Sequence, residues 1–446
     1  MALLLKNVLA IDPQVSLHEA CDILIEDGRI AKVGKGLPSQ ANDEVRDLSG
    51  KVCLPGLVDI HVHFRDPGLE YKEDIETGSR AAAHGGFTDV CCMPNTDPVT
   101  DNAMVVEYIK SRARDLGKCR VHVSGACTKG LKGEALAEMG DMVAHGCVAF
   151  TDDGRGVQDS GMMRRVMDYA VQFGKIVMSH CQDEGLVDKG QVNEGVASTR
   201  LAIQGWPGAG EEIQIHRDIE LSRLTGCPIH IQHLTTAHGI EIVRRAKADG
   251  VKVTCEVTPH HLFLTEDDIT EAYETSLKVN PPLRTKEDSQ ALVEAILDGT
   301  VDCIVTDHAP HADHEKDREF ELAPFGMTGL ETSLASVVDG LVNPGIITWE
   351  RLVELMCVNP RTLLGIPSVK IEEGFTADLT IVDPEEQWTV VTDDFESKAN
   401  NSGFIGRTFK GRATDVYVGG IPTMIDGSVT NGHQDIQFRD YAFNQD

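Results

Sequence analysis

Apolar, β-branched runs alternate with helix-like segments through the middle of the chain. The eight runs are Val58–His63, Thr88–Pro94, Val121–Cys127, Cys147–Thr151, Ile176–His180, Pro228–His233, Lys252–Thr258 and Cys303–Thr306. The helix-like segments between them include Ala103–Leu116, Gly161–Phe173, Ile213–Leu224, Gly239–Ala248 and Lys286–Leu297. Because strands and helices alternate, the pattern predicts parallel strands that are joined by helical crossovers.

The number of these units selects one α/β architecture. Eight strand–helix units over roughly 300 residues match the size of a (β/α)8 barrel. A doubly wound open sheet is the alternative, but it would need a G-x-G-x-x-G turn after an early strand, and the sequence contains none. We therefore predict a (β/α)8 TIM barrel over residues 56–365.

Both ends of the chain instead show short strand-like runs, and no helix is expected in the first 55 residues. The runs are Ala2–Ile11, Asp22–Glu26, Arg29–Val33 and Val52–Leu54 at the start, and Ala377–Val382, Trp388–Val391 and Thr414–Val418 at the end. Asp27-Gly28 and Gly419-Gly420 are typical turn residues. We predict one small β-sandwich domain, built from residues 1–55 and 366–430, with the barrel inserted between its halves. The polar tail, 431–446, is expected to be loosely held or used in subunit contact.

Composition narrows the class of protein. The 446 residues are 41% hydrophobic and 25% charged, as in a soluble globular protein, and the net charge of −30 argues against binding nucleic acid. The apolar start is short and is interrupted by Lys6, so neither a signal peptide nor a membrane span is expected. The twelve cysteines form no CxxC pair, which excludes a zinc ribbon and a disulfide scaffold and favours a reducing cytoplasm.

The first predicted barrel strand ends in a pattern that suits metal binding. In GLVDIHVHFRDPG (56–68), His61 and His63 are two residues apart, so both imidazoles point to the same face of a strand. Arg65 and Asp66 follow, and then a Pro-Gly turn. Two histidines buried in a core would explain this pair equally well, so the rest of the chain has to decide.

Four other predicted strands also end in polar residues that can bind metal. These residues are Asp152 or Asp153, His180, His233 and Asp307. In a (β/α)8 barrel such strand ends converge on one face. Imidazoles and carboxylates are zinc ligands, and six of them are enough for two metals that share a bridging carboxylate and a bridging hydroxide.

Each of these residues has a structural alternative. His180 and His233 could be core histidines, and Asp153 or Asp307 could cap a turn or a helix. His230, His260 and His261 compete as ligands, although His230 lies three residues before His233 and should face the other way. The joint occurrence at five of eight strand ends favours the metal site.

Eight motifs make the chain resemble dihydroorotase, specifically the bacterial class of that enzyme within the amidohydrolase superfamily. The motifs are HVHFRDPG (61–68), MPNT (93–96), FTDDG (150–154), SHCQD (179–183), QHLTT (232–236), TPHHL (258–262), NPPLR (280–284) and TDHAPH (306–311). The first and last of these are highly specific, and the match covers the chain except for its tail.

The resemblance implies two zinc ions per chain, bridged by Asp153 and a hydroxide. One ion would be bound by His61, His63 and Asp307, and the other by His180 and His233. Many superfamily members have a carboxylated lysine at the bridging position, whereas this strand offers FTDDG without a lysine. The choice of Asp153 over Asp152 rests on the resemblance, because spacing alone cannot separate them.

The resemblance also implies the reaction and the residues that contact the substrate. The reaction would be the reversible conversion of N-carbamoyl-aspartate to dihydroorotate in pyrimidine biosynthesis, with Asp307 transferring the proton. The substrate-contact positions would be His63, Arg65, Asn95, Asn280, His311, Phe325 and Gly326. The planar guanidinium of Arg65 suits a carboxylate, although an internal salt bridge to Asp66 is the alternative. A homodimer and association with aspartate transcarbamoylase are further expectations.

Other functions stay open at this stage. An allantoinase or hydantoinase would act on rings without the carboxylate, which would leave Arg65 without that role. A non-catalytic partner of aspartate transcarbamoylase would have lost metal ligands, whereas every ligand position is filled here. The stretch 311–329 is either a lid that closes on substrate or a plain solvated loop.

Overall fold

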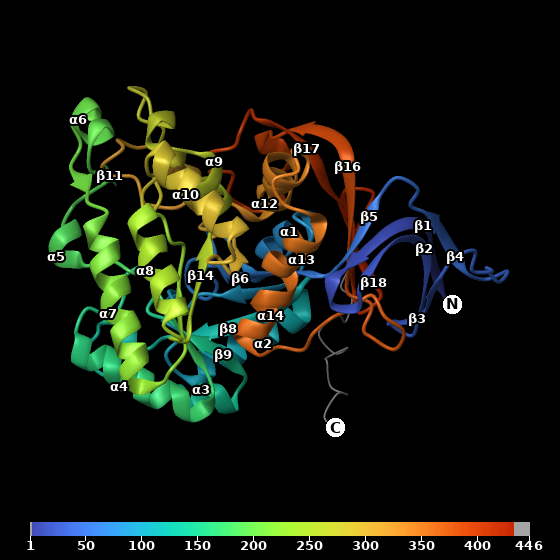
Figure 1. The fold of residues 1–446 in the computed structure, drawn as a ribbon, viewed down its shortest axis with the longest axis horizontal. Coiled ribbons are helices and arrows are strands. Elements are labelled where there is room, and N and C mark those ends of the chain that lie inside the picture. The colour runs from blue at the N-terminus through green and yellow to red at the C-terminus, as the bar shows by residue number, and fades with distance from the viewer. Residues whose placement is uncertain (1, 432–446) are drawn as a thin grey trace.

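The eight apolar runs become the strands of one parallel sheet in a computed structural model, which describes residues 2–431 (Figure 1). These strands are β6 (Leu57–Val62), β7 (Phe87–Cys92), β8 (Arg120–Gly125), β9 (Cys147–Phe150), β10 (Ile176–Ser179), β13 (Ile229–Ile231), β14 (Val253–Val257) and β15 (Cys303–Ile304). Their spatial order, β6-β7-β8-β9-β10-β13-β14-β15, follows the order of the sequence. Val62 pairs in parallel with His308 just after β15, so the sheet closes on itself. The predicted TIM barrel is confirmed.

Helices follow the strands and cover the barrel. They are α1 (Ile75–His84), α2 (Ala103–Leu116), α3 (Met139–Ala144), α4 (Ser160–Ala170), α7 (Ala209–Thr225), α8 (Ala237–Ala248), α10 (Lys286–Leu297), α12 (Leu330–Val337), α13 (Trp349–Val353) and α14 (Asn359–Leu364). Side chains at the N-caps fix several starting points: Asn102 accepts hydrogen bonds from the first turn of α2, and Thr285 does so for α10. No helix within residues 2–431 is long and apolar enough to cross a membrane.

Shorter elements lie in the loops at the carboxyl ends of the strands. They are α5 (Glu184–Val187), α6 (Val196–Leu201), α9 (Pro259–Phe263), α11 (Asp313–Lys316) and the strand pair β11 (Val192–Asn193) and β12 (Gly205–Trp206). The barrel interior below these loops is filled by buried side chains such as Val58, Ile60, Cys91 and Met178. The barrel interior is therefore a packed core rather than a pore.

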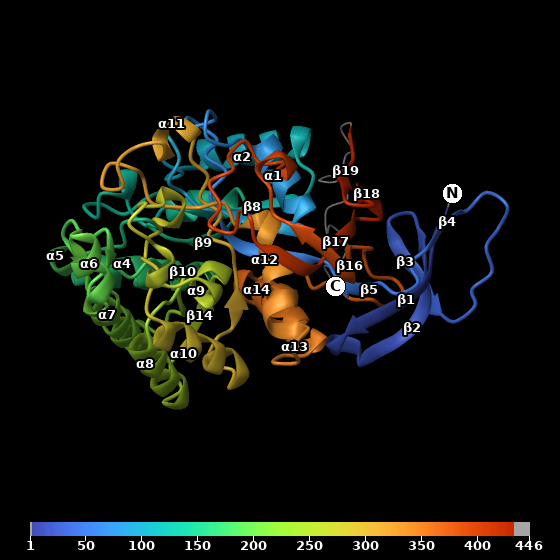
Figure 2. The ribbon, with the colours of Figure 1, turned by 90° about the horizontal axis from the view of Figure 1, so that it is seen from above.

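Both ends of the chain contribute to a second sheet beside the barrel (Figure 2). Within residues 2–431 its strands are β1 (Leu3–Asp12), β2 (Leu17–Glu26), β3 (Arg29–Gly34), β4 (Glu44–Asp47), β5 (Val52–Pro55), β16 (Leu379–Thr389), β17 (Thr408–Val418), β18 (Ile421–Ile425) and β19 (Ser428–Val429). β5 and β16 pair antiparallel and join the two halves. The expectation of a small β domain from both termini is confirmed, whereas its boundaries stay a prediction.

Two local predictions for these ends were wrong, and one lies outside the described residues. Ala377–Val382 and Trp388–Val391 were predicted as two strands, but β16 runs through both, with irregular pairing near Asp383. A 3-10 turn forms at Pro13–Val15, where no helix was expected, because Asp12 caps it and proline suits a first helical position. The predicted polar tail, 431–446, lies outside the described residues except for residue 431.

Candidate active site

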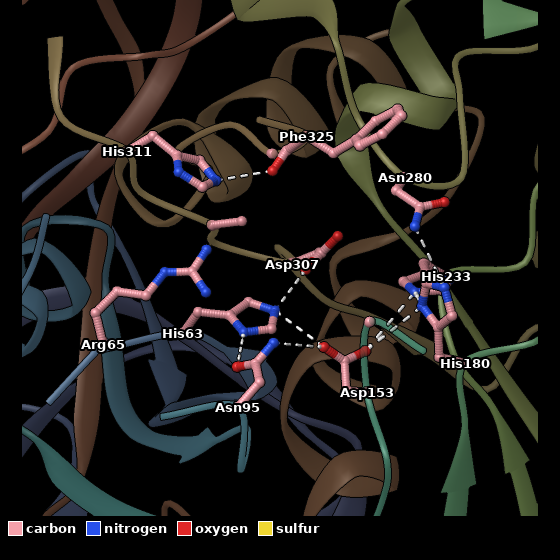
Figure 3. A pocket seen from close by; sticks show the side chains of 13 residues that line it. His63, Arg65, Asn95, Asp153, His180, His233, Asn280, Asp307, His311 and Phe325 are labelled. Atoms are coloured by element: carbon pink, nitrogen blue, oxygen red, sulfur yellow. Dashed lines mark hydrogen bonds and ion pairs between the residues drawn. The ribbon is translucent and has the colours of Figure 1, made fainter. Parts of the chain in front are cut away.

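A cavity of about 230 Å3 opens at the carboxyl ends of the barrel strands (Figure 3). It is lined by His63, Arg65, Asn95, Asp153, Gly154, His180, His233, Asn280, Asp307, Ala309, His311, Phe325 and Gly326. Every predicted substrate-contact residue lines this cavity. The predicted metal ligands line it as well, except His61, which lies fully buried beneath it.

One group of possible metal ligands joins the two ends of the barrel sheet. His61 and His63 come from the end of β6, and Asp307 comes from the segment after β15. The Asp307 Oδ1 atom lies 3.4 Å from His61 Nε2 and 3.0 Å from His63 Nε2. One ligand atom from each residue lies within 4.8 Å of the others, so the group could hold a metal ion.

A second group centres on Asp153, which follows β9. The Asp153 Oδ1 atom lies 3.6 Å from His180 Nδ1 and 4.0 Å from His233 Nε2, and these two nitrogens are 2.8 Å apart. The same carboxylate reaches the first group, 3.3 Å from His61 Nε2 and 3.4 Å from His63 Nε2. Asp153 therefore lies between the two groups, where a bridging ligand would be placed.

The neighbouring aspartate points elsewhere. The Asp152 carboxylate accepts hydrogen bonds from the backbone N–H groups of Cys127 and Thr128, at 2.8 and 3.0 Å, and from the Thr128 hydroxyl. Its acceptor capacity is used to hold the loop after β8. Of the two residues that sequence spacing left undecided, only Asp153 faces the cavity.

His61 shows that this site suits a cation. Its Nδ1 atom lies 2.6 Å from Glu256 Oε1, whereas the buried Nε2 atom has no hydrogen-bond partner among the described residues. Burial alone would lower the pKa of His61, but three surrounding carboxylates, first of all Asp307, outweigh burial and raise the pKa well above its usual value. The carboxylates thus favour positive charge here, which a metal ion would supply in place of the proton.

Glu256 and Gln182 orient the predicted ligands, and sequence reasoning missed both. Glu256 on β14 accepts from His61 through Oε1 and from His230 Nε2, at 2.9 Å, through Oε2. Gln182 Oε1 lies 2.9 Å from His180 Nε2, which leaves His180 Nδ1 for the cavity. A carboxylate or amide oxygen behind a ligating imidazole fixes its tautomer and orientation. For Glu256 the sequence signal was a carboxylate in an otherwise apolar strand.

The competing histidines do not line the cavity. His230 bonds to Thr254 as well as to Glu256, consistent with the structural role expected for it. His261 lies 2.7 Å from the Thr258 hydroxyl and 3.0 Å from the Pro281 carbonyl oxygen, so both of its nitrogens are engaged. His260 is buried, and burial lowers its pKa to about 4.

Arg65 provides buried positive charge across the cavity from His180 and His233 (Figure 3). The residue is 9% exposed, and the only hydrogen bond of its side chain to the described residues is from Nε to the Pro310 carbonyl oxygen at 3.4 Å. No carboxylate of residues 2–431 lies within 4.0 Å of its guanidinium; Asp66, the suspected partner, lies 3.8 Å from Arg112 instead. Burial lowers the pKa of Arg65, so an anion in the cavity would be strongly favoured.

Two asparagine amides frame the space between Arg65 and the histidines. Asn95 Oδ1 accepts from His63 Nδ1 at 2.8 Å, which leaves His63 Nε2 facing the cavity. Asn280 Nδ2 donates to Gln182 Oε1 at 2.9 Å, whereas Asn280 Oδ1 is buried without a partner among the described residues. That oxygen is an acceptor available to an N–H group of a ligand.

The third side of the cavity is formed by a loop after β15. His311 Nε2 donates to the Phe325 carbonyl oxygen at 2.8 Å. Gly326 has a φ of +128°, and a Cβ atom there would lie 2.7 Å from Ala309 Cβ, so only glycine allows this close approach. Because the loop is held against the cavity wall, the alternative of a plain solvated loop does not fit Phe325 and Gly326.

Three cavity residues other than glycine have left-handed backbones. The φ angles are +59° at Arg65, +31° at His233 and +47° at Asp307. Each such conformation costs roughly 1–3 kcal/mol and is typically found at functional sites. All three residues lie two or three positions beyond the ends of β6, β13 and β15, and their side chains line the cavity.

Comparison with known proteins agrees with this geometry. A family model described as dihydro-orotase-like matches residues 50–239. The dihydroorotase of Acetivibrio thermocellus is 48% identical over 427 residues, which cover 96% of this chain and 98% of that protein. That of Geobacter metallireducens is 48% identical over 420 residues, covering 94% and 99%. The chain belongs to the dihydroorotase family.

Solved structures place this family member among the cyclic amidohydrolases. An L-hydantoinase (dihydropyrimidinase) from Arthrobacter aurescens superposes with a TM-score of 0.88 at 28% identity and covers 97% of this chain and 98% of its own. A D-hydantoinase from Thermus sp. gives 0.84 at 26% identity, covering 96% and 97%. The barrel and the two-ended sheet are thus shared with enzymes named for other ring substrates.

Proposed function

We propose that the chain is a zinc-dependent dihydroorotase that interconverts N-carbamoyl-L-aspartate and (S)-dihydroorotate in pyrimidine biosynthesis. The observation that supports it most strongly is Arg65, a buried guanidinium that has no carboxylate partner among residues 2–431 and lines a cavity next to two groups of possible metal ligands. The substrate is a cyclic amide with one ring carboxylate. It can place the carboxylate at Arg65 and the scissile amide at the histidines.

The residues fit a pair of metal ions. His61, His63 and Asp307 would hold one, His180 and His233 would hold the other, and Asp153 would contact both. When bound, two zinc ions would polarise the scissile carbonyl and lower the pKa of a water molecule from 15.7 toward about 7. Glu256 and Gln182 would keep His61 and His180 in the tautomers that direct lone pairs into the site.

Asp307 is the proposed proton carrier. Its carboxylate lines the cavity and lies against His61 and His63, which lower its pKa and keep it ionised at neutral pH. In ring opening it would accept the proton of the attacking water and return it to the leaving ring nitrogen. In the reverse direction it would take the proton from the carbamoyl nitrogen as the ring closes.

The other cavity residues orient the ring. Arg65 would bind the carboxylate through two parallel hydrogen bonds, and Asn95 has a second amide N–H that can support it. Asn280 Oδ1 can accept from a ring N–H, and the backbone of Phe325 and Gly326 can contact the opposite edge of the ring. His311 would complete the carboxylate pocket from the loop side. Holding the ring in this way keeps the reacting carbonyl next to the activated water.

The test combines metal content with turnover. Purified protein is expected to contain close to two zinc ions per chain by mass spectrometry and to open dihydroorotate in a direct assay. A strong chelator should abolish turnover, and added zinc should restore it. Full turnover by metal-free protein would refute the metal site, and loaded protein that leaves dihydroorotate intact would refute the reaction.

A hydantoinase-type reaction is the second candidate, because the solved hydantoinase structures share the whole fold. Hydantoin, allantoin and dihydrouracil lack the ring carboxylate, so each would leave the Arg65 charge unpaired. We expect all three to be poorer substrates than dihydroorotate when they are assayed side by side. A higher kcat/KM for any of them would favour this second candidate.

The assembly and cellular setting are proposed as well. We propose a homodimer in the cytoplasm, with association with aspartate transcarbamoylase as a further partner interaction. All twelve cysteines are buried and free, which is compatible with a reducing compartment. Light scattering of the pure chain, alone and mixed with aspartate transcarbamoylase, measures both associations.

A further inference from the structure

Two buried lysines hold the loop that forms the third side of the cavity; Lys278 lies outside this loop and Lys316 within it. Lys278 is 2% exposed and Lys316 is 8% exposed. No carboxylate oxygen within the described residues lies within 4.0 Å of either ammonium group. Burial lowers the pKa of Lys278 to about 8 and that of Lys316 to about 7. Unpaired buried ammonium groups are costly, so their surroundings must satisfy them in another way.

Backbone carbonyl oxygens provide the compensation. The Lys278 ammonium donates to the carbonyl oxygens of Phe320, Glu321 and Ala323, at 2.7, 3.2 and 2.7 Å. Lys316 donates to those of Thr275, Lys278 and Pro324, at 2.9, 3.5 and 2.8 Å. An ammonium group has three donors, so each lysine uses its full capacity on backbone.

Four of these carbonyl groups follow one another closely in the loop and depend on the lysines. Within residues 2–431, no backbone N–H donates to the carbonyl oxygens of Phe320, Glu321, Ala323 or Pro324. Residues 320–324 therefore lack the backbone pairing that a helix or strand would provide. Removing a lysine would leave buried acceptors unsatisfied, which costs more than the net value of the hydrogen bonds themselves.

The same loop carries cavity residues directly after these carbonyls. Phe325 and Gly326 follow Pro324, and the Gly326 N–H donates to the Lys278 carbonyl oxygen at 2.8 Å. The Lys278 ammonium also lies 4.6 Å from the centre of the Phe325 ring, a cation–π distance. Lys278 precedes Asn280 by two residues, so one side chain connects both walls of the cavity.

We propose that Lys278, supported by Lys316, is a positioning residue that holds the Phe325–Gly326 backbone and Asn280 in the conformation that binds the ring of the substrate. This role rests on the proposed dihydroorotase function, and neither lysine touches the reacting atoms. A loop fixed before binding need not be ordered by the substrate, so the expected contribution is to substrate affinity.

The test replaces the ammonium group of Lys278 and measures two quantities separately, substrate binding and the local opening of the loop. In Lys278→Met, KM for dihydroorotate should rise about tenfold while kcat stays within about threefold. The reason is that the substrate would then have to order the loop when it binds, which lowers the affinity for substrate. Zinc content should not change. An arginine-specific protease should cut after the exposed Arg318 faster than in wild type, since local opening becomes easier. Lys316→Met should act in the same direction.

Two further variants serve as controls. Lys110→Met removes one lysine–carbonyl hydrogen bond, to His145, which lies at the opposite end of β9 from the cavity residue Asp153, and should leave KM unchanged. Lys278→Arg keeps the charge and several donors and should give an intermediate KM. Thermal unfolding of each variant shows whether the protein remains folded, and Lys316→Met provides the second reading if Lys278→Met does not fold.

The outcomes separate this proposal from the proposed function. Faster cleavage at Arg318 with an unchanged KM would show that the lysines serve the fold only. Unchanged cleavage and unchanged KM would show that the ammonium groups do not hold the loop. A wild-type chain that opens no dihydroorotate would instead refute the function, whatever the lysine variants do.

Discussion

At the scale of single residues, two adjacent aspartates have opposite roles although their sequence surroundings are the same. Asp152 uses its carboxylate on the backbone and hydroxyl of the loop after β8, whereas Asp153 faces four imidazoles. Burial by itself would raise the pKa of Asp153, but His61 and its other imidazole neighbours outweigh burial and hold the pKa well below its usual range. Only Asp153 presents a charge that a metal can use.

Replacing Asp153 by alanine should therefore affect the protein differently from replacing Asp152. We expect Asp153→Ala to lower zinc content at both positions, because the carboxylate lies between the two ligand groups. Asp152→Ala should keep its zinc and instead lower the melting temperature, since buried backbone donors lose their acceptor. Metal analysis and thermal unfolding of the two variants measure this. Zinc loss confined to Asp152→Ala would mean that Asp153 is not the bridge.

Two roles are proposed for Asp307, metal ligand and proton carrier, and a conservative change can separate them. Asp307→Asn keeps the shape and one oxygen but cannot carry the proton. With zinc at saturation, we expect turnover in both directions to fall by ~10²–10⁴-fold, the typical contribution of a general acid–base group. A fully metallated variant within a few-fold of wild type would leave Asp307 as a ligand only.

Arg65 separates dihydroorotate from the rings that lack a carboxylate. Arg65→Met should leave the metals in place and lower kcat/KM for dihydroorotate by at least ~10-fold, because hydrogen bonds to charged groups contribute roughly 1.5–3 kcal/mol. Arg65→Lys should recover only part, since an ammonium group cannot form the paired contact. Dihydrouracil should be a poor substrate of both enzymes. If the losses from removing Arg65 and removing the carboxylate simply add, the two groups do not touch.

At the scale of elements, strand ends were predictable from the sequence because local pattern and barrel geometry agree there. In a run such as Ile176–His180, apolar residues continue until Ser179 and His180 mark the point where the strand leaves the core. Barrel topology then brings such points together without further information. The positions of His61, His180 and His233 in one site followed from these two steps.

The sequence pattern did not predict the supporting residues that lie within strands or loops. Glu256 lies within β14 in a run that reads as apolar, and it meets His61 only because the barrel closes. The lysines under the loop at 320–326 bond to backbone carbonyls, whose positions depend on irregular torsions that no periodicity predicts. Contacts between residues of different loops arise from tertiary packing, so the sequence pattern could not reveal them.

Glu256 should matter for metal binding, although it touches no metal. Glu256→Gln keeps an oxygen but removes the charge behind His61, and changes to such supporting groups typically lower metal affinity ~10–100-fold. Competition with a chromogenic zinc chelator measures this affinity without reference to activity. Glu266→Gln is the matched control, because Glu266 is also buried and bonds to Asn193 outside the cavity. Equal zinc affinity in both variants would contradict the role of Glu256.

At the scale of the whole molecule, a buried ion pair joins the two sheets beneath the barrel. Arg120 at the start of β8 donates to Asp378, just before β16, at 2.8 Å, and within the barrel Arg361 on α14 donates to Asp89 on β7 at 2.6 Å. These partners are 258 and 272 residues apart in sequence. The sequence predicted that both termini form one small β domain, but pairs at such separations could not be assigned from pattern alone.

The Arg120–Asp378 pair allows the role of this junction to be measured. Asp378 also accepts from the Gly419 N–H at 2.6 Å, and both charged residues are at most 2% exposed. Asp378→Ala would remove the nearest carboxylate of the buried Arg120 and leave Asp89 at 3.8 Å, so we expect a loss of unfolding free energy no larger than about 3–5 kcal/mol, the cost typical of breaking a buried pair. Urea unfolding should show this loss, while zinc content and KM stay at wild-type values because the cavity lies at the other end of the strands.

A double variant tests whether the two charges are coupled. Arg120→Met combined with Asp378→Leu should lose less unfolding free energy than the sum of the losses in Arg120→Met and Asp378→Leu, since neither charge of the pair remains. Losses that add without coupling would mean that the pair does not hold the two sheets together.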